Sequence, residues 1–406
     1  MKTYRFFTMF STLILMSIIL ITLSACAADQ PSIAIETSAV VNSTATPNPP
    51  TKTLPHPTAT QIPPTETATP TPEPSPPEKP TLTPTKRAQV VFRLHESAIG
   101  SALPLSKLAI FNGPNTDPGG VVYHEGQFHM FYNNLQDFPP TELAIGYATS
   151  PDGINWTRIT DFSILDGTDV PYVDNVIRAA SVLVEDDGTW VLYFDTMAST
   201  ESAPYSVVGR ATANSPIGPW AVDPNPVLAP DEGGWDEYAI QRPCIIKTEA
   251  GYFMYFQAFA SRWDAATFGL ATSSDGINWI KHDTPIFDGS EVTWGQHIAV
   301  RYPYVVKNEQ GWFMFFKATG DKYPNSIGIA VSDNGVDWVL GQHLPVFETA
   351  KYAAWNSVFV DKVIQIDQTW FLFLELENFV VSKVLVATFT GELIPGKNLA
   401  PVAAEP

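Results

Sequence analysis

A pattern that recurs about every sixty residues constrains the fold of this chain more than any other feature. Residues 146–156, 269–279 and 328–338 each begin Gly-x-Ala-x-Ser, continue with Asp-Gly or Asn-Gly, and end in tryptophan, and residues 209–220 hold a divergent copy. The four tryptophans are 64, 59 and 59 residues apart: Trp156, Trp220, Trp279 and Trp338. Between them, alternating apolar runs are separated by Gly, Asp-Gly and Pro turns, which predicts a four-stranded antiparallel sheet in each unit. The repeat therefore indicates a β-propeller with one blade per unit.

A second pattern gives the number of blades. An aromatic strand that ends in a polar residue occurs five times, at residues 128–133, 190–195, 252–257, 312–317 and 370–375. We interpret these as the second strands of five blades, so the predicted fold is an all-β, five-bladed propeller with four antiparallel strands per blade. The apolar strands before them, such as residues 121–123 and 182–184, are predicted to line the central channel.

The first 25 residues have the features of a bacterial lipoprotein signal. Lys2 and Arg5 precede an apolar run over residues 6–21, and Leu-Ser-Ala leads into Cys26. This order predicts a signal peptide over residues 1–25 and a lipid on Cys26, which would anchor the secreted protein to a bacterial membrane at the cell surface. A transmembrane anchor is the alternative, because the apolar run is just long enough to span a bilayer. Both interpretations place the rest of the chain outside the cytoplasm.

The predicted anchor is followed by a linker and one large domain. Residues 26–87 are rich in Pro and Thr and poor in large apolar side chains, so we expect an extended, disordered spacer. Residues 88–406 then form the propeller. With Cys26 lipidated, Cys244 is the only remaining cysteine, which excludes an intrachain disulfide and predicts a small buried hydrophobic side chain.

The charge of the chain restricts its partners. The formal net charge is −19 at pH 7, so a diffuse electrostatic field will not attract nucleic acid. An anionic ligand would need a local basic site. We expect a monomer whose partners are the membrane, through its lipid, and a glycan.

Polar side chains are predicted to gather at one rim of the channel, because the start of a first strand and the end of an antiparallel second strand meet at the same edge. The second strands end in Asn133, Asp195, Gln257, Lys317 and Glu375, and the first strands begin with Asp117, Arg178, Arg242 and Arg301, with the blade 5 register open near Trp355 and Asn356. These residues form either a solvated rim or a ligand site, and charges crowded into a narrow channel favour the site. The repeated tryptophans follow hairpin turns on outer strands and are predicted to pack in the core.

The Thr-Asp117-Pro start of the first blade and the repeated strand pairs resemble the five-bladed propellers of glycoside hydrolase families 43 and 32, and more distantly family 130. The resemblance covers residues 88–406. In those families an Asp at the start of blade 1 is the base or nucleophile, an Asp before a Pro in blade 3 orients and tunes, and a Glu two residues before a Pro in blade 4 is the acid. Asp117 matches the first position, so the resemblance implies a glycoside hydrolase with Asp117 as its catalytic carboxylate.

The chain departs from the family pattern at the other two positions. Arg242 stands before the blade 3 proline, and Arg301 stands two residues before the blade 4 proline. Glycoside hydrolysis ordinarily uses two carboxyl groups, and arginine does not donate its proton near neutral pH. The acid is therefore expected elsewhere on the rim. We expect Glu237 first and Asp195 second, with Asp236, Asp174 and Glu375 as further carboxyl groups near the rim.

Three arginines beside Asp117 suggest an anionic ligand or a tuning role. Guanidinium groups bind carboxylate or phosphate through paired hydrogen bonds. Arg178, Arg242 and Arg301 would then recognise an acidic sugar, or would hold phosphate as in the similar mannoside phosphorylases of family 130. Against the second version, Ala179 and Ala180 occupy the place of an Asp-Pro pair in those phosphorylases.

A glycan-binding lipoprotein without catalysis is the alternative function. Its sugar platforms would be rim aromatics, namely Trp235, Trp263, Trp294 and Trp355. His297 would either line the same mouth or serve a structural role. No metal-ligand motif is visible, and we expect no cofactor, although oxygen ligands from several blades leave room for a calcium ion in the channel.

Overall fold

The structure, a computed structural model, describes residues 93–94, 115–135, 143–173, 176–198, 204–294, 299–321, 323–348, 357–377 and 382–393. All of these lie in the unit from Lys79 to Pro406. The predicted signal peptide, Cys26 and the whole of the predicted linker lie outside the described residues. Within the described ranges every regular element is a β-strand, and no helix there is long and apolar enough to cross a membrane.

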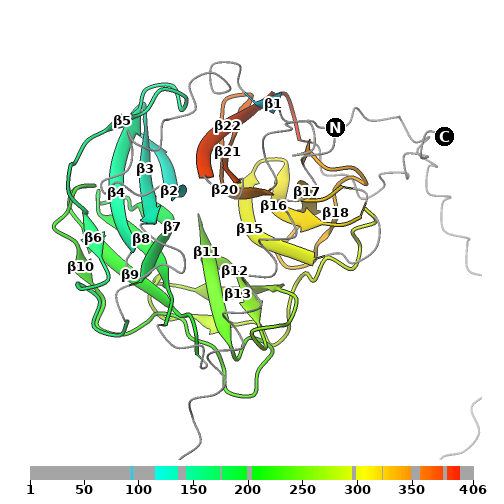
Figure 1. Cartoon of the computed structure of the whole chain (residues 1–406), viewed down its shortest axis with the longest axis horizontal. Coiled ribbons are helices and arrows are strands. Elements are labelled where there is room, and N and C mark those ends of the chain that lie inside the picture. Colours follow the sequence, from blue (N-terminus) through cyan, green and yellow to red (C-terminus); the bar gives the residue numbers. More distant parts are fainter. Residues whose placement is uncertain are drawn as a thin grey trace, which may run out of the picture. The chain divides into compact units, whose positions relative to one another are not determined.

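Five antiparallel sheets form the blades of a propeller (Figure 1). Blade 1 contains β2 (Asn115–His124), β3 (Gln127–Leu135), β4 (Leu143–Ser150) and β5 (Thr157–Arg158), with β6 (Leu165–Asp166) also paired to β4. Blade 2 contains β7 (Ile177–Val184), β8 (Trp190–Thr196), β9 (Val208–Ala213) and β10 (Ala221–Val222). Blade 3 contains β11 (Ala239–Thr248), β12 (Gly251–Phe259), β13 (Thr267–Ser273) and β14 (Ile280–Lys281).

The last two blades complete the ring. Blade 4 contains β15 (Ala299–Asn308), β16 (Gly311–Thr319), β17 (Ser326–Ser332) and β18 (Val339–Leu340), with β19 (Phe347–Glu348) also paired to β17. Blade 5 contains β20 (Ser357–Ile366), β21 (Thr369–Glu377), β22 (Ser382–Thr390) and, as its outermost strand, β1 (Arg93–Leu94). The N-terminal strand β1 therefore ties the start of the domain to its last blade. The predicted five-bladed, all-β fold is confirmed.

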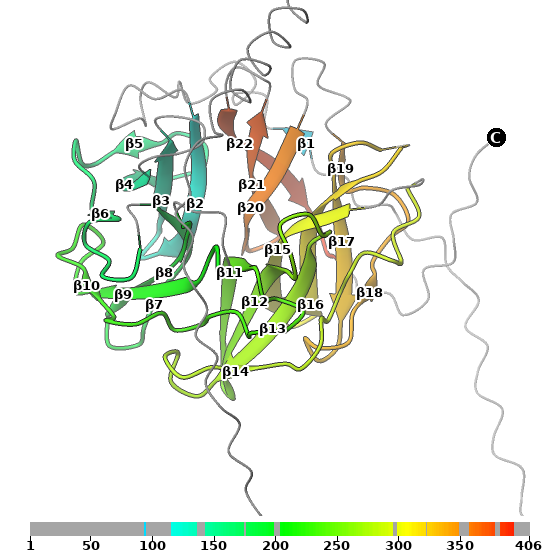
Figure 2. The ribbon, with the colours of Figure 1, turned by 60° about the horizontal axis from the view of Figure 1, so that its bottom comes forward.

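The innermost strand of each blade faces the centre of the ring, as Figures 1 and 2 show for β2, β7, β11, β15 and β20. Each contacts the innermost strand of the neighbouring blade, and β20 contacts β2 to close the circle. The second strands behind them are almost fully buried, because each is covered by a sheet on both sides. This explains why their sequences are continuous aromatic runs.

The repeated tryptophans pack between blades, as expected for residues that belong to the core. Trp156 packs against Phe373 of blade 5, and Trp220 against Phe131 of blade 1. In the same way Trp279 contacts Tyr193, and Trp338 contacts Tyr255, each on the preceding blade. The sixty-residue repeat thus encodes the blade interface.

The turns before these tryptophans are held by their own side chains. In blade 1 the Asp152 carboxylate accepts hydrogen bonds from the backbone N–H groups of Ile154 and Asn155. Gly153 adopts a left-handed φ of 74°, which a residue with a Cβ adopts at a cost. Asp275 repeats this arrangement in blade 3, and Asn334 repeats it in blade 4. The Asp-Gly and Asn-Gly pairs therefore serve the fold.

Candidate functional site at the mouth of the channel

The predicted pairing of strand ends at one rim is confirmed. In the antiparallel ladders Asp117 lies opposite Asn133, and Arg178 lies opposite Asp195. Arg301 lies opposite Lys317 in blade 4. All five innermost strands also have a register shift within two residues of this level, which marks a β-bulge or irregularity in each.

Blade 3 has a register that the sequence did not predict. Gln241, and not Arg242, lies opposite Gln257, so Arg242 occupies the bulge itself. Its φ of 55°, like the φ of 58° at Tyr302 in the blade 4 bulge, is left-handed. Non-glycine residues adopt this backbone at a cost of about 1 kcal/mol or more, and such costs concentrate at functional sites.

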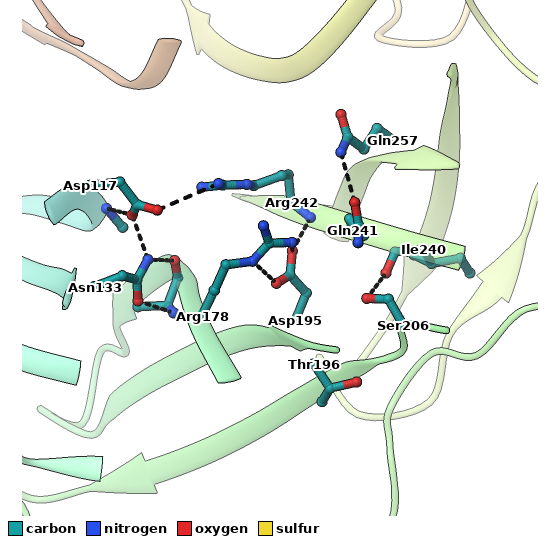
Figure 3. Close-up of polar contacts among 12 residues, drawn as sticks. Asp117, Asn133, Arg178, Asp195, Thr196, Ser206, Ile240, Gln241, Arg242 and Gln257 are labelled. Atoms are coloured by element: carbon teal, nitrogen blue, oxygen red, sulfur yellow. Dashed lines mark hydrogen bonds and ion pairs between the residues drawn. The ribbon is translucent and has the colours of Figure 1, made fainter. Parts of the chain in front are cut away.

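Asp117 is held at the start of blade 1 by three donors (Figure 3). Its Oδ1 accepts hydrogen bonds from Gly119 N at 3.1 Å and from Asn133 Nδ2 at 2.5 Å. Its Oδ2 faces Nη2 of Arg242 at 3.5 Å. The residue is only 2% exposed, so these contacts fix the carboxylate in one orientation.

The polar residues at the ends of the second strands tie each blade to the next. The Asn133 amide oxygen accepts from Ala179 N, an Asp195 oxygen accepts from Arg242 N, and the Gln257 oxygen accepts from Tyr302 N. In blade 4, Lys317 Nζ donates to Ser357 Oγ on blade 5. All four side chains are buried. They therefore do not form a solvated rim. Their hydrogen bonds join neighbouring blades and so position the residues of the site.

Asp195 is fully engaged by its neighbours. Arg178 forms a paired contact with it, Nε to Oδ1 at 2.7 Å and Nη2 to Oδ2 at 3.0 Å, and Arg242 N also donates to Oδ2 at 2.7 Å. Both oxygens are therefore occupied by donors, and neither is placed to deliver a proton to a ligand. Arg178 is likewise committed to a carboxylate and not to an external anion.

Arg242 stands at the centre of the cluster. Its Nη2 faces Asp117, its Nη1 lies 3.1 Å from Asp361 Oδ1, and its guanidinium lies 4.5 Å from the centre of the Tyr302 ring. Burial alone would lower the pKa of Arg242. The neighbours outweigh burial and raise this pKa well above its ordinary value: Tyr302, Asp117, Asp361 and Asp195. Arg242 is thus a fixed cation shared by carboxyl groups of two other blades.

Arg301 does not join the cluster, which corrects the expectation of three arginines around Asp117. It is exposed, and its guanidinium lies 5.1 Å from the centre of the Phe259 ring. The physical reason is the bulge register. Arg301 lies one position before the bulge and points to the rim, whereas Arg242 sits in its bulge and points into the channel.

The sequence analysis missed two buried charges on β20. Burial raises the pKa of Asp361 to about 7, although Arg242 opposes this shift, and burial lowers the pKa of Lys362 to about 8. Lys362 Nζ donates to Ala180 O and lies 4.6 Å from the centre of the Tyr304 ring. The signal that could have revealed them is an Asp-Lys pair inside a largely apolar strand.

The other predicted acids lie apart from these contacts. Glu237 is exposed on the turn before β11. Asp236 is buried, and its carboxylate pairs with Lys281 and accepts from Asp231 N, so it braces that turn. Glu375 lies two residues before the end of β21 and is half-buried, close enough for its charge to act on Tyr302. Asp174 lies outside the described residues.

The tryptophans predicted to be sugar platforms differ in their exposure. Trp235 is half-buried and stacks on Phe256, and Trp294 is buried, so both pack inside the domain. Trp263 is 84% exposed, on the loop after β12 that leaves the same rim. His297 and Trp355 lie outside the described residues. Within the ranges that the structure describes, no cluster of three or more His, Cys, Asp or Glu side chains could hold a metal ion.

Sequence comparison places the chain beside enzymes that act on fructose-containing saccharides. No family model matches it. It is 25% identical to a fructan 1-exohydrolase of Aegilops speltoides over 176 residues, 42% of this chain and 29% of that one, and 31% identical to β-fructofuranosidase 1 of Zea mays over 121 residues, 29% of this chain and 18% of that one. The chain thus spans under a third of these curated relatives. An uncharacterised protein of Mycobacterium tuberculosis is 25% identical over 53% of this chain and 71% of its own length.

Solved structures share the fold at low sequence identity. A glycosyl hydrolase from Bacteroides ovatus superposes with a TM-score of 0.56 at 16% identity, covering 76% of this chain and 96% of that one. A β-1,2-mannobiose phosphorylase from Listeria innocua gives a TM-score of 0.57 at 14% identity, covering 74% and 96%. The chain therefore has a five-bladed propeller fold, which this glycosyl hydrolase and this phosphorylase share. The resemblance predicted from the sequence, to family 32 and more distantly to family 130, is confirmed.

Proposed function

We propose that this protein hydrolyses glycosidic bonds at the mouth of its channel, with Asp117 as the carboxylate that attacks the anomeric carbon or activates water. One observation carries the proposal. Asp117 is buried at the start of the first channel strand, where Gly119 N, Asn133 and Arg242 hold it in place. A buried carboxylate that donors hold at the start of an innermost strand fits the part of base or nucleophile. The similarity to fructosidases supports the same reaction class.

The contacts favour a neutral sugar over an anionic one. Arg178 and Arg242, which were expected to bind an anion, already face carboxylates at ion-pair distance. Their charges are therefore balanced inside the protein. We infer that the substrate is an uncharged oligo- or polysaccharide, and that fructose-containing and mannose-containing glycans are the first to test, because relatives and structural neighbours carry names of those classes.

A substrate panel tests the proposal. The purified full-length chain is incubated with fructans, sucrose and β-1,2-mannobiose, with and without inorganic phosphate, and the release of free monosaccharide is followed by chromatography. We expect release from at least one glycan, at a rate that does not depend on phosphate. Release only with phosphate would instead establish a phosphorylase. Absence of release from an extended panel of glycans would contradict both.

Glycan binding without catalysis is the second candidate. Trp263, exposed on the mouth side of blade 3, offers a sugar-stacking surface, and the guanidinium of Arg262 lies 4.8 Å from its ring centre. If the protein only binds glycans, calorimetry should detect binding of a glycan from the panel without cleavage of its glycosidic bonds. Binding of this kind would also survive changes to Asp117.

We further propose that the protein is attached to a bacterial membrane at the cell surface through a lipid on Cys26. The support is the basic, apolar and Leu-Ser-Ala-Cys order of the first 26 residues. Bacterial cells that express the full chain are grown with a radiolabelled fatty acid. We expect the label in the wild-type protein and not in the Cys26→Ala variant. Equal labelling of both would exclude this anchor.

A further inference from the structure

Two carboxyl groups from different blades share one guanidinium. Arg242 of blade 3 contacts Asp117 Oδ2 of blade 1 through Nη2 and Asp361 Oδ1 of blade 5 through Nη1. Guanidinium has a planar fork, so the two carboxyl groups face it from adjacent directions. Asp361 is therefore a neighbour of Asp117 although 244 residues separate them in sequence.

The second oxygen of Asp361 is different from those of the other buried carboxyl groups in the cluster. Asp361 Oδ2 is buried and makes no hydrogen bond within the described part of the chain. Asp361 also lines a pocket in the channel, together with Gly119, Arg242 and Tyr302. A bare carboxylate oxygen in such a place is costly, whereas a protonated one can donate to whatever enters the pocket.

The remaining carboxyl groups near the mouth are less suited to giving a proton. The oxygens of Asp195 accept three hydrogen bonds from Arg178 and Arg242, and Asp236 is paired with Lys281. Glu237, the first choice from sequence, is exposed on a turn. Among the described carboxyl groups, only Asp361 combines contact with the cation that holds Asp117, an oxygen without a hydrogen bond, and a place in the lining of the pocket.

We propose that Asp361 is the second carboxyl group of the site and protonates the departing oxygen during glycoside cleavage. This inference rests on the proposed hydrolysis. As the bond between the anomeric carbon and the glycosidic oxygen breaks, the proton of Asp361 Oδ2 moves to that oxygen, and the leaving alcohol departs neutral. Water supplies the new oxygen on the anomeric carbon and loses its proton to a carboxylate, directly or after an ester with Asp117, so that one water is consumed for each bond cleaved.

The charges around Asp361 permit this role near neutral pH. Charged and titratable groups from all five innermost strands act on Asp361 or contact its partner Arg242. They are Arg242, Asp117, Lys362, Arg178 and Tyr302. Desolvation is the largest influence and raises the pKa of Asp361 to about 7, while Arg242 opposes it. The acid form is thus populated below about pH 7. Activity that needs this proton should fall as pH rises through that range.

Leaving-group dependence tests the assignment. Wild type, Asp361→Asn and Asp361→Glu are compared on a methyl glycoside and a dinitrophenyl glycoside of the sugar that the wild type cleaves. A nitrophenolate leaves without protonation, so the missing acid matters little there. We expect Asp361→Asn to lower kcat/KM by about 10²- to 10⁴-fold on the methyl glycoside and by less than about tenfold on the dinitrophenyl glycoside. The alkaline limb near pH 7 in the pH profile of the wild type should be absent in Asp361→Asn. Asp361→Glu should restore part of the activity on the methyl glycoside and part of this limb.

The outcomes separate the two proposals. Equal losses on both glycosides, with an unchanged pH profile, would mean that Asp361 only supports Arg242, and would overturn the assignment. Absence of cleavage of every glycan in the substrate panel by the wild type would overturn the proposed function itself. Thermal unfolding of each variant shows whether a loss comes from misfolding, and the dinitrophenyl glycoside serves as an internal control because it requires the same folded site.

Discussion

Asp117→Asn is expected to lower kcat/KM for glycoside hydrolysis by about 10³-fold or more, and to lower stability by about 1–2 kcal/mol because its amide nitrogen then faces Arg242 in place of Oδ2. The amide is nearly the same size, and its oxygen can still accept from Gly119 N and Asn133 Nδ2, the two contacts that hold Oδ1. It cannot attack the anomeric carbon or take a proton from water. The matched control is Asp283→Asn, which makes the same chemical change at an exposed position.

The comparison uses initial rates on the glycan that the wild type cleaves and a thermal melt of each protein. Control and wild type should hydrolyse alike. If Asp117→Asn keeps wild-type turnover, Asp117 is not the catalytic carboxylate. If it loses turnover but also melts far below the control, the loss would be structural.

Arg242→Met should destabilise the fold by about 3–5 kcal/mol at neutral pH, whereas Arg301→Met should cost less than about 1 kcal/mol. Arg242 is buried between Asp117 and Asp361, so its removal leaves two buried carboxyl groups without their cation. Arg301 is exposed and contacts the Phe259 ring. The two arginines looked equivalent in the sequence, which makes them a matched pair. Chemical denaturation of each variant measures the difference.

This loss should also depend on pH. Asp361 already has a raised pKa in the folded state, and loss of Arg242 raises that pKa further because Arg242 opposes the effect of burial. A carboxyl group whose folded pKa lies above its unfolded value of about 4 destabilises the fold increasingly as pH rises between the two values. The deficit of Arg242→Met is therefore expected to be smaller at pH 5 than at pH 8. An equal deficit at both values, or equal deficits for both arginines, would contradict the shared-cation arrangement.

Much of the architecture could be predicted because short sequence motifs repeat in the blades. The Asp-Gly-x-x-Trp motif encodes a turn and an interblade contact, for example Trp279 on Tyr193, and the Asn-Gly copy in blade 4 forms the same kind of contact. The antiparallel rule then predicts that Asp117 and Asn133 meet at one rim, and the ladder pairs them. The N-terminal strand β1 that completes blade 5 escaped prediction, since two residues carry no periodic signal.

The partners in the site were harder to predict because they depend on bulges. One extra residue in a strand decides whether a side chain points to the rim or into the channel, and this separates Arg301 from Arg242. Asp361 lies in a strand whose neighbours are mostly apolar, and only the assembled ring brings it to Arg242. Burial and ion pairing between distant blades have no linear motif.

Cleavage in ¹⁸O-labelled water tests the central claim most directly. The full-length chain is incubated with the glycan that gives the strongest signal in the panel, in labelled water that contains phosphate, and the products are analysed by mass spectrometry. Hydrolysis predicts a released sugar that carries ¹⁸O from the solvent, made by the wild type and not by Asp117→Asn. A sugar phosphate without ¹⁸O at the anomeric carbon, or binding with no released product, would contradict the proposed hydrolase.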